Sequence, residues 1–112
     1  MKNTKTTLLL AAVFGLGVAL AQADDGKTLF EKNCASCHGK DGKGETKMGK
    51  RAGCKDYTDA KVQAGVTDDQ ALKAVKEGLK EGETVKMKPF ADKLTDDEIK
   101  SCIAYLRDFA KK

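Results

Sequence analysis

The chain has 112 residues, 34% of them charged and 5% aromatic, with four Cys, one Pro and no Trp. That length holds one domain, with or without a targeting segment. The formal net charge of +4, from 21 Lys and Arg against 17 Asp and Glu, argues against a dedicated nucleic-acid-binding protein, which needs a strong field of one sign.

The first 23 residues contain the three parts of a secretory signal peptide. Two lysines precede an uncharged run over residues 8–20, and Ala-Gln-Ala then ends the segment at Ala23. A basic start, an apolar centre and a small-x-small exit are typical of such a signal. The apolar centre is shorter than the ~20 residues that a membrane-spanning helix needs. We predict that residues 1–23 are cleaved and that residues 24–112 form the mature domain in an exported, oxidising compartment, the periplasm.

The mature chain begins with a helical pattern that then stops. A first helix is predicted over residues 26–37, in which Phe30 is apolar and Gly26 allows another backbone to approach closely. The Gly- and Lys-rich stretch 39–53 has no apolar period and is predicted to be a loop. A short, weak helix is predicted over residues 58–64.

Two capping boxes mark the helices of the second half. Thr-Asp-Asp-Gln at residues 67–70 begins one helix, for which Gly78 is the candidate stop. Thr-Asp-Asp-Glu at residues 95–98 begins the last helix. Helical spacing is kept there by six residues: Ile99, Cys102, Ile103, Leu106, Phe109 and Ala110. No alternating apolar run or hairpin turn is evident, so the fold class predicted for the domain is all-α.

The motif that carries chemistry is Cys-Ala-Ser-Cys-His at residues 34–38. Cys-x-x-Cys followed at once by His is the attachment pattern for c-type haem. The thiols of Cys34 and Cys37 can each add across one haem vinyl group, which gives two thioether bonds. His38 then lies next to the ring, where its imidazole can ligate the iron.

Three other interpretations of these residues compete with haem attachment. A thioredoxin-type dithiol belongs at a strand-to-helix turn in a βαβ unit, and no strand is detected. A zinc site needs four ligands, and the candidates have irregular spacing: Cys34, Cys37, His38, Cys54 and Cys102. A plain structural disulfide gives no role to His38. Haem attachment is therefore favoured.

The sequence resembles the small bacterial class I cytochromes c over nearly the whole mature chain. The resemblance rests on Gly26 and Phe30 before residues 34–44, then on Met-Lys-Pro-Phe at 87–90, and then on residues 94–99 and 104–107. It implies a cytochrome c fold whose N- and C-terminal helices cross over one covalently bound haem c. It also implies a monomeric, non-enzymatic carrier of single electrons between redox-partner proteins, with iron cycling between Fe(II) and Fe(III). A haem catalyst or ligand-binding sensor with an open axial position is the alternative.

The second iron ligand is predicted to be Met87. His38 is the only His of the chain, so the two axial ligands cannot both be His of this protein. Met48 is within reach of the iron, but Met87 lies in a polar stretch where an apolar side chain has no stripe to join. Pro89 keeps the residue before it out of a helix, and the family's Met-x-Pro-Phe loop matches here. Thioether sulfur favours reduced iron.

One departure from the family concerns the proximal side of the haem. Many class I cytochromes have a Pro after the haem motif, and its carbonyl accepts the proton of the proximal His. Pro89 is the only Pro of this chain. The carbonyl acceptor for His38 is therefore expected to come from another residue between Met48 and Gly53.

Two further cysteines are unusual. Cys102 falls on the apolar stripe of the last helix, and by resemblance Cys54 sits where the loop after the haem motif meets that helix. An oxidising compartment would then pair them, and we predict a Cys54–Cys102 disulfide. The alternative is two small buried thiols that act as apolar side chains.

Basic side chains follow the haem motif and surround the Met loop. In the resembling fold these two loops border the exposed haem edge, so the basic side chains could steer an acidic redox partner. The alternative is an ordinary solvated surface, since acidic residues are interleaved. We call this set the lysine rim: Lys40, Lys43, Lys47, Lys50, Arg51, Lys80, Lys86 and Lys88.

Overall fold

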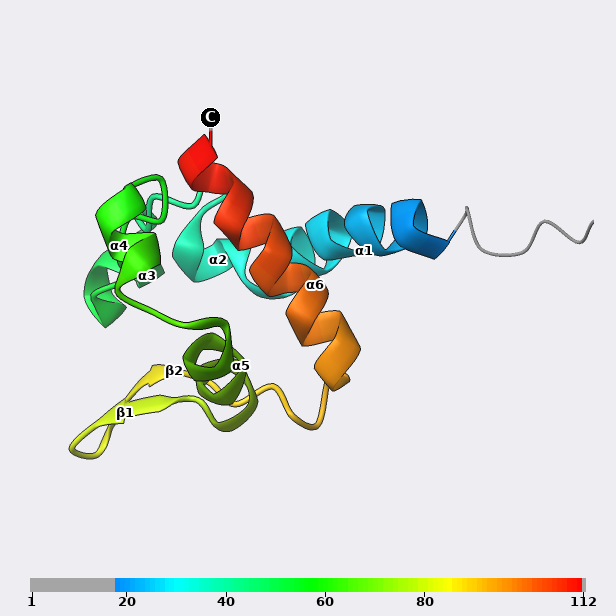
Figure 1. Ribbon diagram of the computed structural model, residues 1–112. Helices are drawn as coiled ribbons and strands as arrows, with labels where there is room; N and C mark the ends of the chain where they lie inside the picture. The colour runs from blue at the N-terminus through cyan, green and yellow to red at the C-terminus, as the bar shows by residue number, and fades with distance from the viewer. Residues whose placement is uncertain (1–17, 112) are drawn as a thin grey trace, which may run out of the picture.

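The computed structural model describes residues 18–111 (Figure 1). Residues 1–17, which make up most of the predicted signal peptide, lie outside the described residues, and cleavage after Ala23 stays a prediction. Within the described residues, no helix combines the length and the apolar character needed to cross a membrane.

The described part of the chain is mostly helical. Its elements in chain order are α1 (Val18–Asn33), α2 (Ala35–His38), α3 (Lys47–Ala52), α4 (Ala60–Ala64), α5 (Asp68–Glu77), β1 (Leu79–Glu81), β2 (Thr84–Met87), α6 (Asp96–Arg107) and the 3-10 helix η1 (Asp108–Lys111). The predicted cytochrome c arrangement is confirmed, because α1 and α6 cross and pack on each other (Figure 1).

The crossing of α1 and α6 depends on the absence of a side chain at Gly26. A Cβ atom there would lie 2.5 Å from the carbonyl oxygen of Ser101 in α6, so only glycine permits this separation of the two backbones. One turn further along α1, the Phe30 ring is 2% exposed and lies 5.3 Å from the Tyr105 ring and 5.5 Å from the Phe109 ring, centroid to centroid. Such aromatic pairs add to the free energy of burial.

The two predicted capping boxes begin α5 and α6. The Thr67 hydroxyl accepts from the backbone N–H of Gln70 at 3.1 Å, and the Gln70 side chain accepts from the Thr67 N–H at 2.9 Å. Thr95 and Glu98 repeat this pair of bonds at 3.1 and 3.0 Å. Each box satisfies N–H groups that no helical partner can reach. Gly78 ends α5, as predicted.

A second apolar cluster joins α5 to α6. Leu94, Ile99 and Ile103 are buried at its centre, and Leu72 and Phe90 pack against them. The positions of α5 and of the segment after β2 are thus set by the same helix that crosses α1.

The structure corrects the all-α prediction at one place and the loop prediction at another. β1 and β2 form an antiparallel hairpin with Glu81 opposite Thr84. Gly82 has φ +62°, as the first central residue of a two-residue hairpin turn requires. The stretch 39–53, predicted to be a loop, contains α3. Its N-cap is Thr46, whose hydroxyl accepts from the Gly49 N–H at 2.8 Å.

Candidate functional site

The motif at residues 34–38 forms a single helical turn. The backbone N–H groups of Cys37 and His38 both donate to the carbonyl of Cys34, at 3.2 and 2.9 Å, and the Cys34 N–H donates to Phe30 in α1 at 2.8 Å. Residues three and four apart share one face of a helix. The turn therefore brings Cys34, Cys37 and His38 together and fixes them to the end of α1.

Helix α3 packs against the back of this turn at Gly49. A Cβ atom on Gly49 would overlap the carbonyl oxygen of Cys37 and lie 2.6 Å from that of Gly44. The Thr46 hydroxyl donates to the Cys37 carbonyl at 2.8 Å, and the Gly44 N–H donates to the His38 carbonyl at 2.8 Å. The backbone of the haem motif is thus held by the loop and the helix that follow it.

The His38 ring is held between aromatic side chains and has no hydrogen-bond partner at one nitrogen. Its centroid lies 5.7 Å from that of Tyr57, edge to face, and 6.2 Å from that of Phe30. Burial lowers the pKa of His38, so the neutral imidazole, the form that binds a metal, is favoured. Nδ1 of His38 is buried without a partner.

The expectation of a carbonyl acceptor for His38 between Met48 and Gly53 is therefore wrong for the described residues. The reason is local. The segment coils into α3, whose carbonyls bond along their own chain: the Gly49 carbonyl accepts from Cys54 at 2.8 Å and the Lys50 carbonyl from Gly53 at 3.3 Å. No carbonyl of this segment bonds to the buried Nδ1 of His38.

The two candidate Met ligands lie on neighbouring elements. Met87 is half-buried at the end of β2, opposite Leu79 of β1. Met48 is 51% exposed on α3, which packs against both α2 and β2. The most exposed large hydrophobic side chains of the described residues are Met48, Leu79 and Val85, and all three lie on α3 or the hairpin. Of these elements, α3 lies directly against α2, so Met48 is on the helix that adjoins the haem motif.

The cysteines are not paired as predicted. Across the described residues all four are free thiols, and the Cys102 thiol is hydrogen-bonded to Cys34 rather than to Cys54. That hydrogen bond and burial raise the pKa of Cys34, whereas the same bond lowers the pKa of Cys102. Cys54 lies near Cys37, and burial raises its pKa. The predicted Cys54–Cys102 disulfide is therefore not formed among the described residues, where Cys54 follows α3 and lies near Cys37.

Sequence reasoning missed a polar network that positions Tyr57. The Gln63 amide is buried and donates to the carbonyls of Tyr57 and Leu106, both at 2.8 Å. The Arg107 guanidinium donates to the Gln63 side-chain oxygen at 2.9 Å and to Asp68 at 2.8 Å. Arg107 ends the last block of the resemblance, but nothing in the sequence singled out Gln63.

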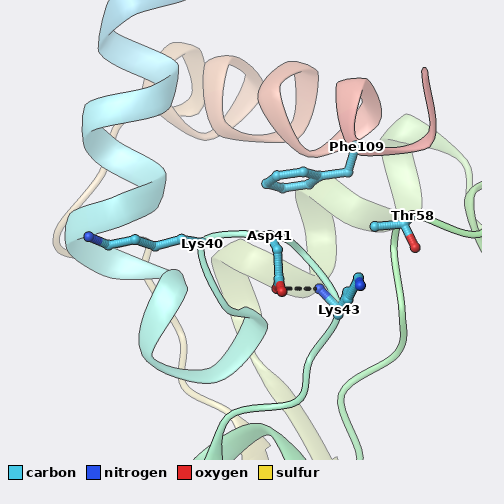
Figure 2. A pocket seen from close by; sticks show the side chains of 5 residues that line it. All are labelled: Lys40, Asp41, Lys43, Thr58 and Phe109. Atoms are coloured by element: carbon cyan, nitrogen blue, oxygen red, sulfur yellow. Dashed lines mark hydrogen bonds between the residues drawn. The ribbon is translucent and has the colours of Figure 1, made fainter. Parts of the chain in front are cut away.

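The lysine rim is solvent-exposed apart from Lys86, which lies 3.8 Å from Glu81. Figure 2 shows part of the rim, around a shallow pocket lined by Lys40, Asp41, Lys43, Thr58 and Phe109. The backbone N–H of Lys43 donates to Asp41 there at 3.1 Å. None of the predicted haem ligands lines this pocket.

In the part of the chain that the structure describes, no His, Cys, Asp or Glu cluster suits a bare metal ion, which counts against the zinc alternative.

Comparison with known proteins identifies the family to which the chain is similar. Residues 23–110 match the family model described as cytochrome c. The solved structure of the KustC0563 c-type cytochrome is 34% identical, with a TM-score of 0.67 over 76% of this chain and 96% of that chain. A Tyr-to-Phe mutant of the same cytochrome is 36% identical, with a TM-score of 0.67 over 76% and 98%. No curated protein sequence matches the chain.

Proposed function

The chain belongs to the cytochrome c family, and we propose that its mature form is an exported, monomeric carrier of single electrons. In this proposal one haem c is attached to Cys34 and Cys37, and the axial ligands are His38 and Met87. The observation that carries the proposal is the turn at 34–38, in which both thiols and a neutral imidazole lie on one short helix. Helix α3 packs against that helix and against β2, the strand that ends at Met87.

Haem c bound at this site would supply a one-electron Fe(III)/Fe(II) couple. The chain's own residues would keep its surroundings rigid. Thr46 holds the Cys37 carbonyl, and Tyr57 and Phe30 restrict rotation of the His38 ring. A site that changes little between two oxidation states suits electron transfer better than it suits binding of a substrate.

The hairpin supports Met87 as the second ligand. The backbone of β2 is fixed where the Met87 carbonyl packs against Gly78. A Cβ atom on Gly78 would lie 2.6 Å from that carbonyl oxygen. Thioether ligation stabilises the reduced iron and raises the potential. With His38 and Met87 both bound, neither axial position is open to a substrate, which favours a carrier over an enzyme.

The lysine rim gives the proposed carrier a means of choosing partners. Exposed cations on and around α3 and the hairpin would attract an acidic redox protein and speed its encounter. This attraction is screened by salt. Electron transfer to such a partner should slow as the ionic strength rises, and a rate that is independent of salt would contradict this part of the proposal.

The decisive experiment compares Met87→Ala with Met48→Ala. The full-length chain is expressed together with haem-attachment machinery, and the mass and the optical spectrum of the product are recorded. The wild-type product should exceed the mass of its polypeptide by one haem, and its spectrum should show the weak long-wavelength band of Met-bound ferric iron. Met87→Ala should lose that band and have a lower reduction potential, whereas Met48→Ala should keep both.

Other outcomes identify the rival functions. Covalent haem without the band in the wild type would indicate an open axial position, as in a catalyst or a sensor. A colourless product with free Cys34 and Cys37 would indicate a dithiol protein. Loss of the band in Met48→Ala rather than in Met87→Ala would reassign the ligand. The mass also reports where the signal peptide is cleaved.

A further inference from the structure

We propose that Gly78, the C-cap of α5, is a positioning residue for the distal iron ligand, and that the end of α5 holds the chain around Met87 in place. We call residues 87–91 the ligand segment. The inference rests on the proposed function, because it concerns the side chain that is to bind the iron.

The hairpin leaves the end of α5, and its second strand runs back toward that helix (Figure 1). Strand β1 begins directly after Gly78, and β2 ends at Met87, whose pairing partner in β1 is Leu79. The ligand segment then returns to α5, where the Phe90 N–H donates to the Val75 carbonyl at 2.8 Å. Met87 is thus held by strand pairing on its own residue and by a helix end three residues later.

The ligand segment also caps α5. Carbonyls in the last turn of a helix have no partner within that helix. The Val75 and Lys76 carbonyls obtain theirs from the ligand segment, the second of them from the Ala91 N–H at 3.3 Å. The Phe90 side chain packs against the buried cluster that joins α5 to α6. The segment is therefore tied to the core by its backbone and by a side chain.

The ligand segment passes Gly78 at a distance that leaves no room for a side chain. A Cβ atom on Gly78 would lie 2.6 Å from the Met87 carbonyl oxygen, 2.9 Å from the Pro89 nitrogen and 3.1 Å from the Lys88 carbonyl carbon. All three atoms belong to the backbone and cannot rotate away. Pro89 has no N–H, so its nitrogen needs no hydrogen-bond acceptor at this close contact.

The backbone conformation of Gly78 also requires glycine. Its φ of +77° and ψ of 179° lie in a region that is open essentially to Gly alone. Another residue here would have to redirect the chain as it leaves α5 or displace the ligand segment. Either change would move the Met87 sulfur, and metal–ligand bonds tolerate displacements of only about 0.2 Å.

The test compares Gly78→Ala with Gly82→Ala in the full-length chain, expressed with haem-attachment machinery. Gly82 is the matched control, because it lies in the same hairpin and has φ +62°, but a Cβ there would meet nothing within 4 Å. Three quantities are measured on each haem-bound product: the intensity of the long-wavelength band, the affinity of ferric iron for added imidazole, and the free energy of unfolding.

Imidazole must displace the thioether, so its affinity reports how well the ligand segment holds Met87. Overpacking a filled site commonly changes an equilibrium constant by about tenfold or more. Gly78→Ala should therefore weaken the band and bind imidazole about tenfold more tightly than the wild type. Gly82→Ala should match the wild type in both.

The unfolding measurement separates positioning of the ligand from stability of the fold. Gly78→Ala that is less stable but keeps the band and the imidazole affinity would overturn the inference, as would equal changes in Gly82→Ala. If Gly78→Ala yields no haem-bound protein, Ala91→Pro decides, because it removes the N–H that donates to Lys76 and adds no atom at Gly78. It should weaken the band, and an unchanged band would again refute the inference. A wild type with covalent haem but no band would instead show that the proposed function is wrong about Met87.

Discussion

Gly49→Ala sets two opposing effects against each other within α3. Gly49 is buried in a helix, and replacing Gly by Ala in a helix interior ordinarily stabilises by about 1 kcal/mol. Here, however, the added Cβ would overlap the carbonyl oxygen of Cys37 and lie 2.6 Å from that of Gly44. Steric exclusion is therefore expected to decide the outcome.

The size of the effect follows from the kind of neighbour. Overpacking a filled site costs about 1–3 kcal/mol. The upper value applies here, because both obstructing atoms belong to the backbone and cannot rotate away. Subtracting the gain in helix propensity leaves a net loss of about 2 kcal/mol, which corresponds to a fall in melting temperature of about 8–16 °C for a domain of this size. Since the obstructed carbonyl belongs to Cys37, the yield of haem-bound protein should fall as well.

Thermal unfolding of the haem-bound protein followed by circular dichroism measures this loss. The matched control is Gly65→Ala, because Gly65 has φ −78° and a Cβ there would lie 3.5 Å from the Val62 carbonyl oxygen, an ordinary van der Waals contact. That control should be stabilised by about 0.4–1 kcal/mol. If Gly49→Ala were as stable as Gly65→Ala, α3 would not pack on the haem motif as described.

Three further predictions concern the same region. Arg107→Ala should lower the free energy of unfolding by about 2–3 kcal/mol in denaturant titrations, because it strips charged donors from the buried Gln63 side chain, and Arg107→Lys should not restore it. Thr46→Val should cost about 1–2 kcal/mol, since it removes both the helix cap and the donor to Cys37, whereas Thr46→Ser should be nearly neutral. In the haem-free chain, burial lowers the pKa of His38, so the unfolded chain binds a proton that the fold excludes. The free energy of unfolding of that haem-free chain should therefore fall as the pH drops below about 6.5. A value that stays flat through that range would contradict the burial of the ring.

Features set by neighbours in the sequence were predictable from it. The boxes at Thr67 and Thr95 are complete within four residues each, and the stop at Gly78 needs only the local backbone. A close approach of another backbone at Gly26 was predicted because glycine has no side chain, and the resemblance implied the crossing of the first and last helices. The turn at 34–38 is equally local, so the grouping of its thiols and imidazole followed from spacing alone.

Features set by tertiary contacts could not be predicted from the sequence. The hairpin has only Gly82 and a two-residue turn as its local signal, and its strands are too short for an alternating pattern to stand out. Helix α3 could not be predicted because its sequence has no apolar period. It is stabilised instead by packing of Gly49 on Cys37 and by the Thr46 cap. The partner of Cys102 depends on how α6 crosses α1, and spacing along the chain contains no information on that distance.

The missing acceptor at His38 and the packing of α3 have one cause. Where other class I cytochromes are expected to have a proline carbonyl beside the proximal His, this chain forms the capped helix α3, in which the Gly49 and Lys50 carbonyls accept from Cys54 and Gly53. Nδ1 of His38 is left without a partner. The ring is instead oriented by its contact with the Tyr57 ring, and Gln63 fixes Tyr57 by donating to its carbonyl. A His ligand without a hydrogen-bond acceptor donates less charge to its metal. If His38 binds haem iron as proposed, the proximal side of this site should therefore favour the reduced state, in the same direction as the proposed thioether ligand, Met87.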